Sequence, residues 1–198
     1  NTLFNGLLNQ PDFKDVDFSN LKVSLGGGMA VQDAVAKKWQ EVTNSPLLEA
    51  YGLSETSPAA TINPCNGTHR MGTIGLPIPN TDLKIFADDM KEVPVGERGE
   101  IGIKGPQVMA GYWNRPEETA KTLTSDGWLK TGDIAVMKDD GFLQIVDRKK
   151  DMILVSGFNV YPNELEDVVS TYEKVLEVAA IGVIDEKCGE VPKLFIVK

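Results

Sequence analysis

Three consecutive glycines directly after a short apolar run constrain the fold of this chain more than any other feature. The run covers residues 21–25, and the glycines occupy 26–28. Apolar residues at helical spacing follow in 31–42, and a second short apolar run begins at Leu47. A strand, a glycine-rich loop, a helix and a strand indicate an α/β domain, in which ligands bind at the carboxyl ends of the strands. We therefore expect residues 1–69 to be part of an α/β subdomain.

Strand signals dominate the middle of the chain. Apolar and smaller residues alternate in 100–104, which is typical of a strand. Two further apolar runs, 134–137 and 142–146, flank an Asp-Asp-Gly turn, and Asp-Gly favours the backbone geometry of a hairpin. A short helix is expected at Arg115-Pro116, since proline is tolerated at the first helical position. We expect residues 70–148 to form a small antiparallel β-barrel or sandwich.

The third region begins at a charged stretch, residues 147–151. Pro162 can begin a helix with an apolar face, and two apolar runs, 178–184 and 194–197, indicate strands. One helix and two strands make a thin core. We therefore expect residues 149–198 to be a hinge followed by a truncated α+β C-terminal domain.

The composition excludes several classes of protein. The 198 residues have a net charge of −9, which argues against a nucleic-acid partner because phosphate backbones require clustered Lys and Arg. The single histidine, His69, leaves no room for most metal sites or for a Ser-His-Asp triad. The two cysteines lie far apart in the sequence and favour a reduced, cytosolic setting, and no apolar run has the length of a membrane span.

The glycine-rich loop is the first candidate for a binding site. Its backbone could approach a flat or anionic ligand closely. It matches neither a dinucleotide fingerprint, since Val31 replaces the third glycine, nor a phosphate-binding loop with Gly-Lys-Ser/Thr. On its residues alone, a tight structural turn is the favoured interpretation. The candidate segment runs from Ser24 to Ala30 and includes Gly27, Gly28, Met29 and Ala30.

Three further segments offer chemistry for a nucleotide. Tyr51 can stack on a base, Ser54 can donate to a phosphate, and Glu55 suits Mg²⁺, although a strand ending in a turn explains this segment equally well. Asp133 could accept hydrogen bonds from ribose hydroxyls, yet a turn carboxylate capping local N–H groups is favoured. Arg148 could bind ribose or phosphate, or belong to a solvated basic run. A thiol nucleophile at Cys65 is disfavoured because its surroundings indicate a plain loop.

Taken together, these segments resemble one superfamily, the adenylate-forming enzymes that include acyl-CoA synthetases, luciferases and peptide-synthetase adenylation domains. Residues 51–56 resemble its Tyr-Gly-x-Thr-Glu element, and 99–113 resemble its barrel motif. Residues 130–133 are similar to its Thr-Gly-Asp element, and 147–157 to its hinge and the following loop. All four occur in the order of the family.

Two stretches are particularly similar to bacterial long-chain fatty acid–CoA ligases, namely residues 26–32 and 145–164. That family implies two half-reactions: a fatty acid and ATP give acyl-AMP and pyrophosphate, and the thiolate of CoA then attacks acyl-AMP. ATP, Mg²⁺ and CoA are the implied cofactors and cosubstrates. Another acyl or aryl specificity and a non-catalytic nucleotide-binding module are the alternatives. A peripheral contact with the inner face of the membrane is reasonable because long acyl chains partition into bilayers.

The resemblance implies roles for residues in the nucleotide half of the site. Segment 27–30 would line the adenine and acyl pocket, and Tyr51, next to Gly52, would stack on adenine. Ser54 would bond the α-phosphate, and Glu55 would hold Mg²⁺.

It implies further roles around the hinge. Asp133 would bind the ribose hydroxyls, and Arg148 would assist at ribose or phosphate. Lys150 would be the hinge between two orientations of the C-terminal domain, and Gly157 would lie along the pantetheine path.

The chain departs from the family pattern in two motifs. We find no Ser/Thr/Gly-rich phosphate loop that ends in Lys, and neither Lys193 nor Lys198 follows a glycine as the catalytic lysine does. We therefore expect that the 198-residue chain alone does not catalyse adenylation. Measurable exchange of pyrophosphate into ATP by the purified chain would contradict this expectation.

Overall fold

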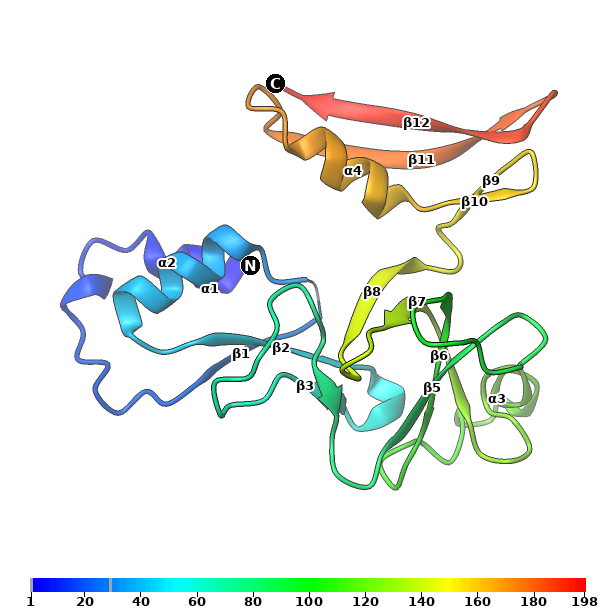
Figure 1. Cartoon of the computed structure of the whole chain (residues 1–198), viewed down its shortest axis with the longest axis horizontal. Coiled ribbons are helices and arrows are strands. Elements are labelled where there is room, and N and C mark those ends of the chain that lie inside the picture. The colour runs from blue at the N-terminus through cyan, green and yellow to red at the C-terminus, as the bar shows by residue number, and fades with distance from the viewer. Residues whose placement is uncertain (1, 29) are drawn as a thin grey trace.

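The first sheet of the computed structural model combines a parallel and an antiparallel part. The structure describes residues 2–28 and 30–198. β1 and β2 pair in parallel, and the antiparallel strands β3 and β4 complete the order β1-β2-β3-β4 (Figure 1). The elements here are α1 (Thr2–Leu8), the 3-10 helix η1 (Phe13–Asp15), β1 (Ser24–Gly26), α2 (Asp33–Thr43), β2 (Leu47–Gly52), the 3-10 helix η2 (Ser54–Thr56), β3 (Ala59–Ile62) and β4 (Leu76–Pro77).

The helix α2 covers one face of this sheet because its apolar side chains recur at helical spacing. Trp39 is buried with Val35 of the same helix and Leu47 of β2. Its ring meets Phe4 edge to face at 4.9 Å, and its indole N–H donates to Ser24 Oγ at 3.0 Å. The predicted order of strand, glycine-rich loop, helix and strand is confirmed.

The second sheet is an antiparallel meander in the order β5-β6-β7-β8. The hairpin predicted around the Asp-Asp-Gly turn is confirmed, as β7 and β8 pair on either side of it. The expected helix after Arg115 is α3. The elements are β5 (Asp82–Phe86), β6 (Arg98–Lys104), α3 (Pro116–Thr122), β7 (Leu129–Met137) and β8 (Leu143–Arg148).

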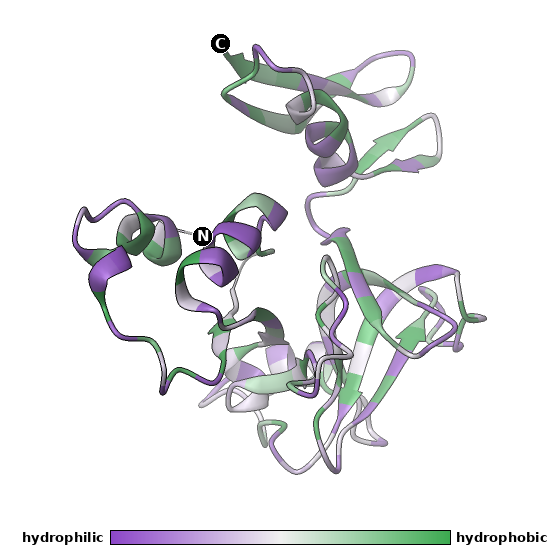
Figure 2. Cartoon of the chain, turned by 60° about the vertical axis from the view of Figure 1, so that its left-hand side comes forward, coloured by the Kyte–Doolittle hydropathy of each residue, from purple (hydrophilic) through white to green (hydrophobic). Residues whose placement is uncertain are grey.

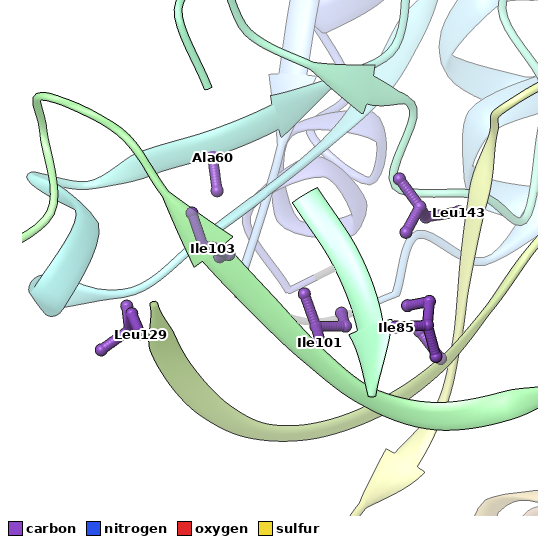
Figure 3. Packing of buried hydrophobic residues seen from close by; sticks show 7 residues of the cluster. Ala60, Ile85, Ile101, Ile103, Leu129 and Leu143 are labelled. Atoms are coloured by element: carbon purple, nitrogen blue, oxygen red, sulfur yellow. The ribbon is translucent and has the colours of Figure 1, made fainter. Parts of the chain in front are cut away.

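The core of the meander joins it to the first sheet. Ile101 and Ile103 of β6 are fully buried beside Leu129 of β7 and Leu143 of β8, and Ala60 of β3 packs against them (Figure 3). Burying an aliphatic side chain contributes about 1.5 to 3 kcal/mol. This shared core therefore fixes the end of β2 and η2 relative to β7 and β8.

The expected closure of this region into a barrel is not seen among the described residues. β5 and β8 are the two edges of the sheet, and each pairs with a single neighbour in it. Instead, β8 is connected to the first sheet by an isolated antiparallel bridge between Leu143 and Gly75, the residue before β4. The antiparallel prediction is confirmed, and the observed form is an open meander.

The third sheet has the order β10-β9-β12-β11 and is covered by α4, which packs against β11 (Figure 1). The predicted helix and strands are present, with longer strands than predicted, whereas the hairpin of β9 and β10 was not predicted. Buried side chains are few here, in agreement with the thin core that the sequence indicates. The elements are β9 (Ile153–Val155), β10 (Phe158–Val160), α4 (Pro162–Ser170), β11 (Glu177–Asp185) and β12 (Gly189–Val197).

The hydropathy of the chain follows this architecture. In Figure 2, helices carry both hydrophobic and hydrophilic residues, as expected where one face packs on a sheet. None of the helices in the described part of the chain is both long and apolar enough to cross a membrane.

Candidate nucleotide site

Three residues from separate segments meet where the first sheet contacts the meander. The Tyr51 hydroxyl donates a hydrogen bond to Asp133 Oδ2 at 2.6 Å. The Arg148 guanidinium lies on the other side, with Nε 3.8 Å from Asp133 Oδ1. Asp133 and Arg148 are cross-strand partners in β7 and β8, so the sheet itself places them together. Three of the candidate residues that the sequence singled out, Tyr51, Asp133 and Arg148, therefore form one cluster.

The electrostatics of this cluster keep an acceptor available on Asp133. Burial raises the pKa of Asp133, against the opposing effects of the Tyr51 hydrogen bond and the Arg148 charge. Burial, followed by the charge of Asp133, also raises the pKa of the Tyr51 phenol, so this hydroxyl remains a neutral donor. The Asp133 side chain is 15% exposed. Its Oδ1 can therefore still accept hydrogen bonds from a ligand.

A cleft of about 470 Å³ opens beside the cluster. This volume lies within the range of small-molecule sites, about 300 to 1,000 Å³. Asp133, Arg148 and Lys150, all predicted as site residues, line this cleft. The lining residues are Leu53, Thr131, Gly132, Asp133, Arg148, Lys149 and Lys150.

The turn that presents Asp133 is held by Glu100, which the sequence analysis missed. Glu100 Oε1 accepts the Gly132 N–H at 2.9 Å, and Oε2 accepts from Lys149 Nζ at 2.9 Å. The Lys149 N–H in turn donates to Gly132 O at 2.8 Å. Asp133 N–H donates to Thr131 Oγ1 at 3.1 Å. Gly132 of β7 and Lys149, which follows β8, are thereby both held by the largely buried carboxylate of Glu100.

Glu55 lies at a second cavity, of about 400 Å³, which shares the lining residues Leu53, Thr131, Gly132 and Lys149 with the first. One carboxylate oxygen, Oε1, accepts from the Tyr112 hydroxyl at 2.7 Å. Its main-chain O accepts the Met109 N–H at 2.8 Å. Ser54 precedes it at the exposed start of η2. Tyr112, which restrains Glu55, is the second residue that the sequence analysis missed.

The setting of Glu55 fits only a Mg²⁺ ion whose coordination shell is completed by substrate phosphates. Among residues 2–28 and 30–198, no group of three or more His, Cys, Asp and Glu could hold a metal ion. Mg²⁺ commonly uses one or two carboxylates together with substrate phosphates and water. The Tyr112 hydroxyl donates to Oε1, so Glu55 Oε2 takes no part in that hydrogen bond. A single carboxylate at the cavity wall is consistent with that mode.

The glycine-rich loop is placed against the strand that ends in Tyr51. A Cβ on Gly27 would lie 3.1 Å from Ala50 O, so the loop backbone approaches β2 closely. Gly28 has φ +80°, which favours glycine. Ala30 is exposed, and Met29 lies outside the described residues. The structure therefore brings this part of the predicted site next to the Tyr51 strand.

Two other predicted positions differ in their surroundings. A Cβ on Gly52 would lie 1.7 Å from Pro58 O, so this glycine is required by the fold whatever its role toward a ligand. Gly157 lies in the turn between β9 and β10, and it lines neither cavity. Cys65 is exposed and also lines neither, in agreement with the loop interpretation.

We predict that Tyr51→Phe lowers the free energy of unfolding by about 1 to 3 kcal/mol, the usual cost of leaving a buried acceptor unpaired. The change deletes the donor to Asp133 Oδ2 and keeps the ring. Urea unfolding followed by tryptophan fluorescence measures the difference. Tyr172→Phe is the matched control, since this side chain is 59% exposed. Equal losses in both variants would show that the hydrogen bond contributes nothing.

A family model described as "AMP-binding enzyme" matches residues 1–113. The chain is 59% identical over 198 residues to a long-chain-fatty-acid–CoA ligase of Yersinia pestis, covering 100% of this chain and 35% of that protein. The Bacillus subtilis ligase of the same name is 45% identical over 99% of this chain and 35% of its own length. A feruloyl-CoA synthase of Amycolatopsis sp is 36% identical, over 99% of this chain and 40% of its own length.

Solved structures agree with the sequence relatives. ATP-bound MatB from Rhodopseudomonas palustris superposes with a TM-score of 0.88 at 31% identity, covering 98% of this chain and 39% of that one. The anthranilate CoA ligase AuaEII in complex with anthranoyl-AMP gives 0.82 at 30% identity, over 98% and 37%. The chain thus spans about a third of the length of the curated ligases it matches. The mixed α/β fold is that of adenylate-forming enzyme domains, and the chain belongs to the AMP-binding enzyme family.

Proposed function

We propose that the chain supplies the nucleotide-binding and hinge portion of a long-chain fatty acid–CoA ligase. The reaction converts a fatty acid, ATP and CoA into acyl-CoA, AMP and pyrophosphate through acyl-AMP. The proposal rests chiefly on the cluster of Tyr51, Asp133 and Arg148 beside a cleft of nucleotide size. Identity of 59% to a relative named for this activity supports the choice of substrate.

Asp133 binds the ribose of the nucleotide in this proposal. Its Oδ1 accepts from the sugar hydroxyls, while Tyr51 donates to Oδ2 and fixes the carboxylate orientation. The Tyr51 ring stacks on adenine, with Gly52 and the loop 27–30 beside it. Arg148 offsets the negative charge of the carboxylate and reaches ribose or phosphate.

Glu55 would hold Mg²⁺ on the phosphates, and Ser54 would donate to the α-phosphate. When bound, the metal offsets charge repulsion between the fatty acid carboxylate and the triphosphate. The Tyr112 hydroxyl keeps the Glu55 carboxylate at the cavity wall, so little rearrangement is needed on binding. Preorganised charge, in contrast to a nucleophilic side chain, is thus the contribution of these residues.

Residues 149–198 move as a unit about Lys150, whereas residues 1–69 and 70–148 stay together through their shared core. Side-chain contacts across the hinge include an exposed pair, in which the two terminal guanidinium nitrogens of Arg98 in β6 donate to the carboxylate of Glu164 in α4. Exposed ion pairs contribute at most about 1 kcal/mol, so this pair can open. Movement of this kind brings Gly157 to the path of the CoA pantetheine arm.

A substrate panel tests the proposed specificity in the protein that contains this chain. CoA-thioester formation is measured with long-chain and medium-chain fatty acids and with ferulate, because a feruloyl-CoA synthase is also a relative. The proposal requires the highest kcat/KM for a long-chain fatty acid. A preference for ferulate would assign an aryl-CoA ligase. Nucleotide binding without thioester formation from any acid would assign a non-catalytic binding module.

A further inference from the structure

A buried carboxyl group lies beneath the glycine-rich loop. Glu49 belongs to β2, two residues before Tyr51, and is only 6% exposed. Its Oε1 accepts the N–H of Val31 at 2.7 Å, where the loop returns to α2. The other oxygen, Oε2, has no hydrogen-bond partner among the described residues. The shortest polar contact of the side chain is therefore to the loop.

The loop is fastened at both ends over β1 and β2. At its start, Gly26 is the parallel partner of Glu49, and a Cβ on Gly26 would lie 2.6 Å from Val31 Cγ2. Gly27 lies against Ala50 O. At its end, the hydrogen bond from Val31 to Glu49 closes the turn. The Val31 side chain is itself buried beside Leu47, so loss of that bond would change the direction of the Val31 N–H while both ends of the loop stay in contact with the sheet.

Packing does not require a carboxyl group at this position. The neighbours Leu47 and Leu48 in β2 are each 1% exposed, so an apolar side chain would suit the site. Burial of a carboxyl group is costly unless its oxygens are hydrogen-bonded. Here burial raises the pKa of Glu49, an effect that the backbone N–H groups of Val31 and, after it, Gly72 oppose. A group placed at such cost, with the loop as its partner, indicates a role in loop geometry.

The position of Glu49 is itself fixed by a buried amide. The Asn63 N–H donates to Glu49 O at 2.9 Å, and its Nδ2 donates to Thr73 O at 2.6 Å. Asn63 is 2% exposed and Thr73 is 8% exposed. The carboxyl group thus projects toward the loop from β2, which is paired with β1 on one side and β3 on the other.

We infer that Glu49 is a positioning residue for the nucleotide pocket, and that its carboxyl oxygen, by accepting the Val31 N–H, sets the course of residues 26–28 and 30–31 of the loop against β2. The inference rests on the proposed function in one respect, which is that segment 27–30 contacts the adenine end of ATP. Glu49 itself touches no substrate. Its effect on the reaction passes entirely through the loop backbone.

The test replaces Glu49 in the ligase that contains this chain. Glu49→Leu deletes the acceptor and keeps a side chain of similar size, and we expect the KM for ATP to rise about tenfold. The kcat stays within twofold and the KM for CoA is unchanged, because the loop interaction is equal in ground and transition states. Glu49→Gln retains a carbonyl acceptor and restores the KM for ATP to within threefold. The dissociation constant of AMP, measured by calorimetry, rises by the same factor as the KM.

The control and the opposite outcomes separate this inference from the proposed function. Glu41→Leu, at an exposed position on α2, leaves both the KM for ATP and the affinity for AMP unchanged. A Glu49→Leu enzyme with a lower Tm but an unchanged KM for ATP would overturn the inference. Failure of both Glu49→Leu and Glu49→Met to yield folded protein would also overturn it, in favour of a role in folding. Absence of ATP-dependent activity in the wild type would instead remove the proposed function.

Discussion

Asp133→Ala is expected to lower kcat/KM for ATP by about 100-fold in the ligase that contains this chain. Two charge-assisted hydrogen bonds to ribose hydroxyls, at about 1.5 kcal/mol each, account for a factor of this size. The largely buried setting of the carboxylate strengthens them, because a hydrogen bond gains strength where water is excluded. The loss falls on the KM for ATP, since ribose contacts are the same in the ground and transition states.

Matched variants locate that effect. Asp133→Asn keeps one carbonyl acceptor and is expected to lose about tenfold. Asp139→Ala, in the exposed hairpin turn that follows β7, is the control and keeps wild-type kinetics. An Asp133→Ala enzyme within threefold of the wild type would exclude Asp133 from the nucleotide site.

Glu55→Gln is expected to lower kcat by about 100- to 1,000-fold, the usual cost of removing one preorganised electrostatic group. The amide keeps the shape of the side chain but loses the charge that would hold Mg²⁺. The Mg²⁺ concentration for half-maximal activity should rise as well. Pyrophosphate exchange into ATP, titrated with MgCl₂, measures both effects.

Two companions test whether the charge is responsible. Tyr112→Phe removes the hydrogen bond to Glu55 but keeps the carboxylate, so its kcat should fall by less than about tenfold. Glu173→Gln, at an exposed position, should change nothing. A Glu55→Gln enzyme with normal kcat and normal Mg²⁺ dependence would show that the metal is held elsewhere.

Local signals were sufficient for most of the fold. The apolar periodicity of α2 and the Asp-Asp-Gly turn between β7 and β8 predicted elements that the structure contains. The hairpin of β9 and β10 was missed because each strand has only three residues, too few for a clear alternation. The open edge of the meander was also missed, since strand signals give the presence of strands but not whether the first and last of them pair.

In the site, too, local sequence signals were predictive and contacts between distant segments were not. Tyr51 and Asp133 could each be singled out from their own segment, but their hydrogen bond depends on the contact between two sheets. Glu100 lies in a strand, where a Glu usually faces water, so its hold on the Gly132 turn had no sequence signal. Glu49 was hidden in the same way, between leucines and an alanine that indicate only a buried strand.

The most direct test of the account compares AMP with 2′-deoxy-AMP and 3′-deoxy-AMP by equilibrium binding. The proposed contact between Asp133 and the ribose predicts that the wild-type ligase binds each deoxy analogue about tenfold more weakly than AMP. In Asp133→Ala, all three nucleotides should bind with the same low affinity. Equal affinity of the wild type for AMP and both deoxy analogues would contradict the assignment of this cluster as the ribose site.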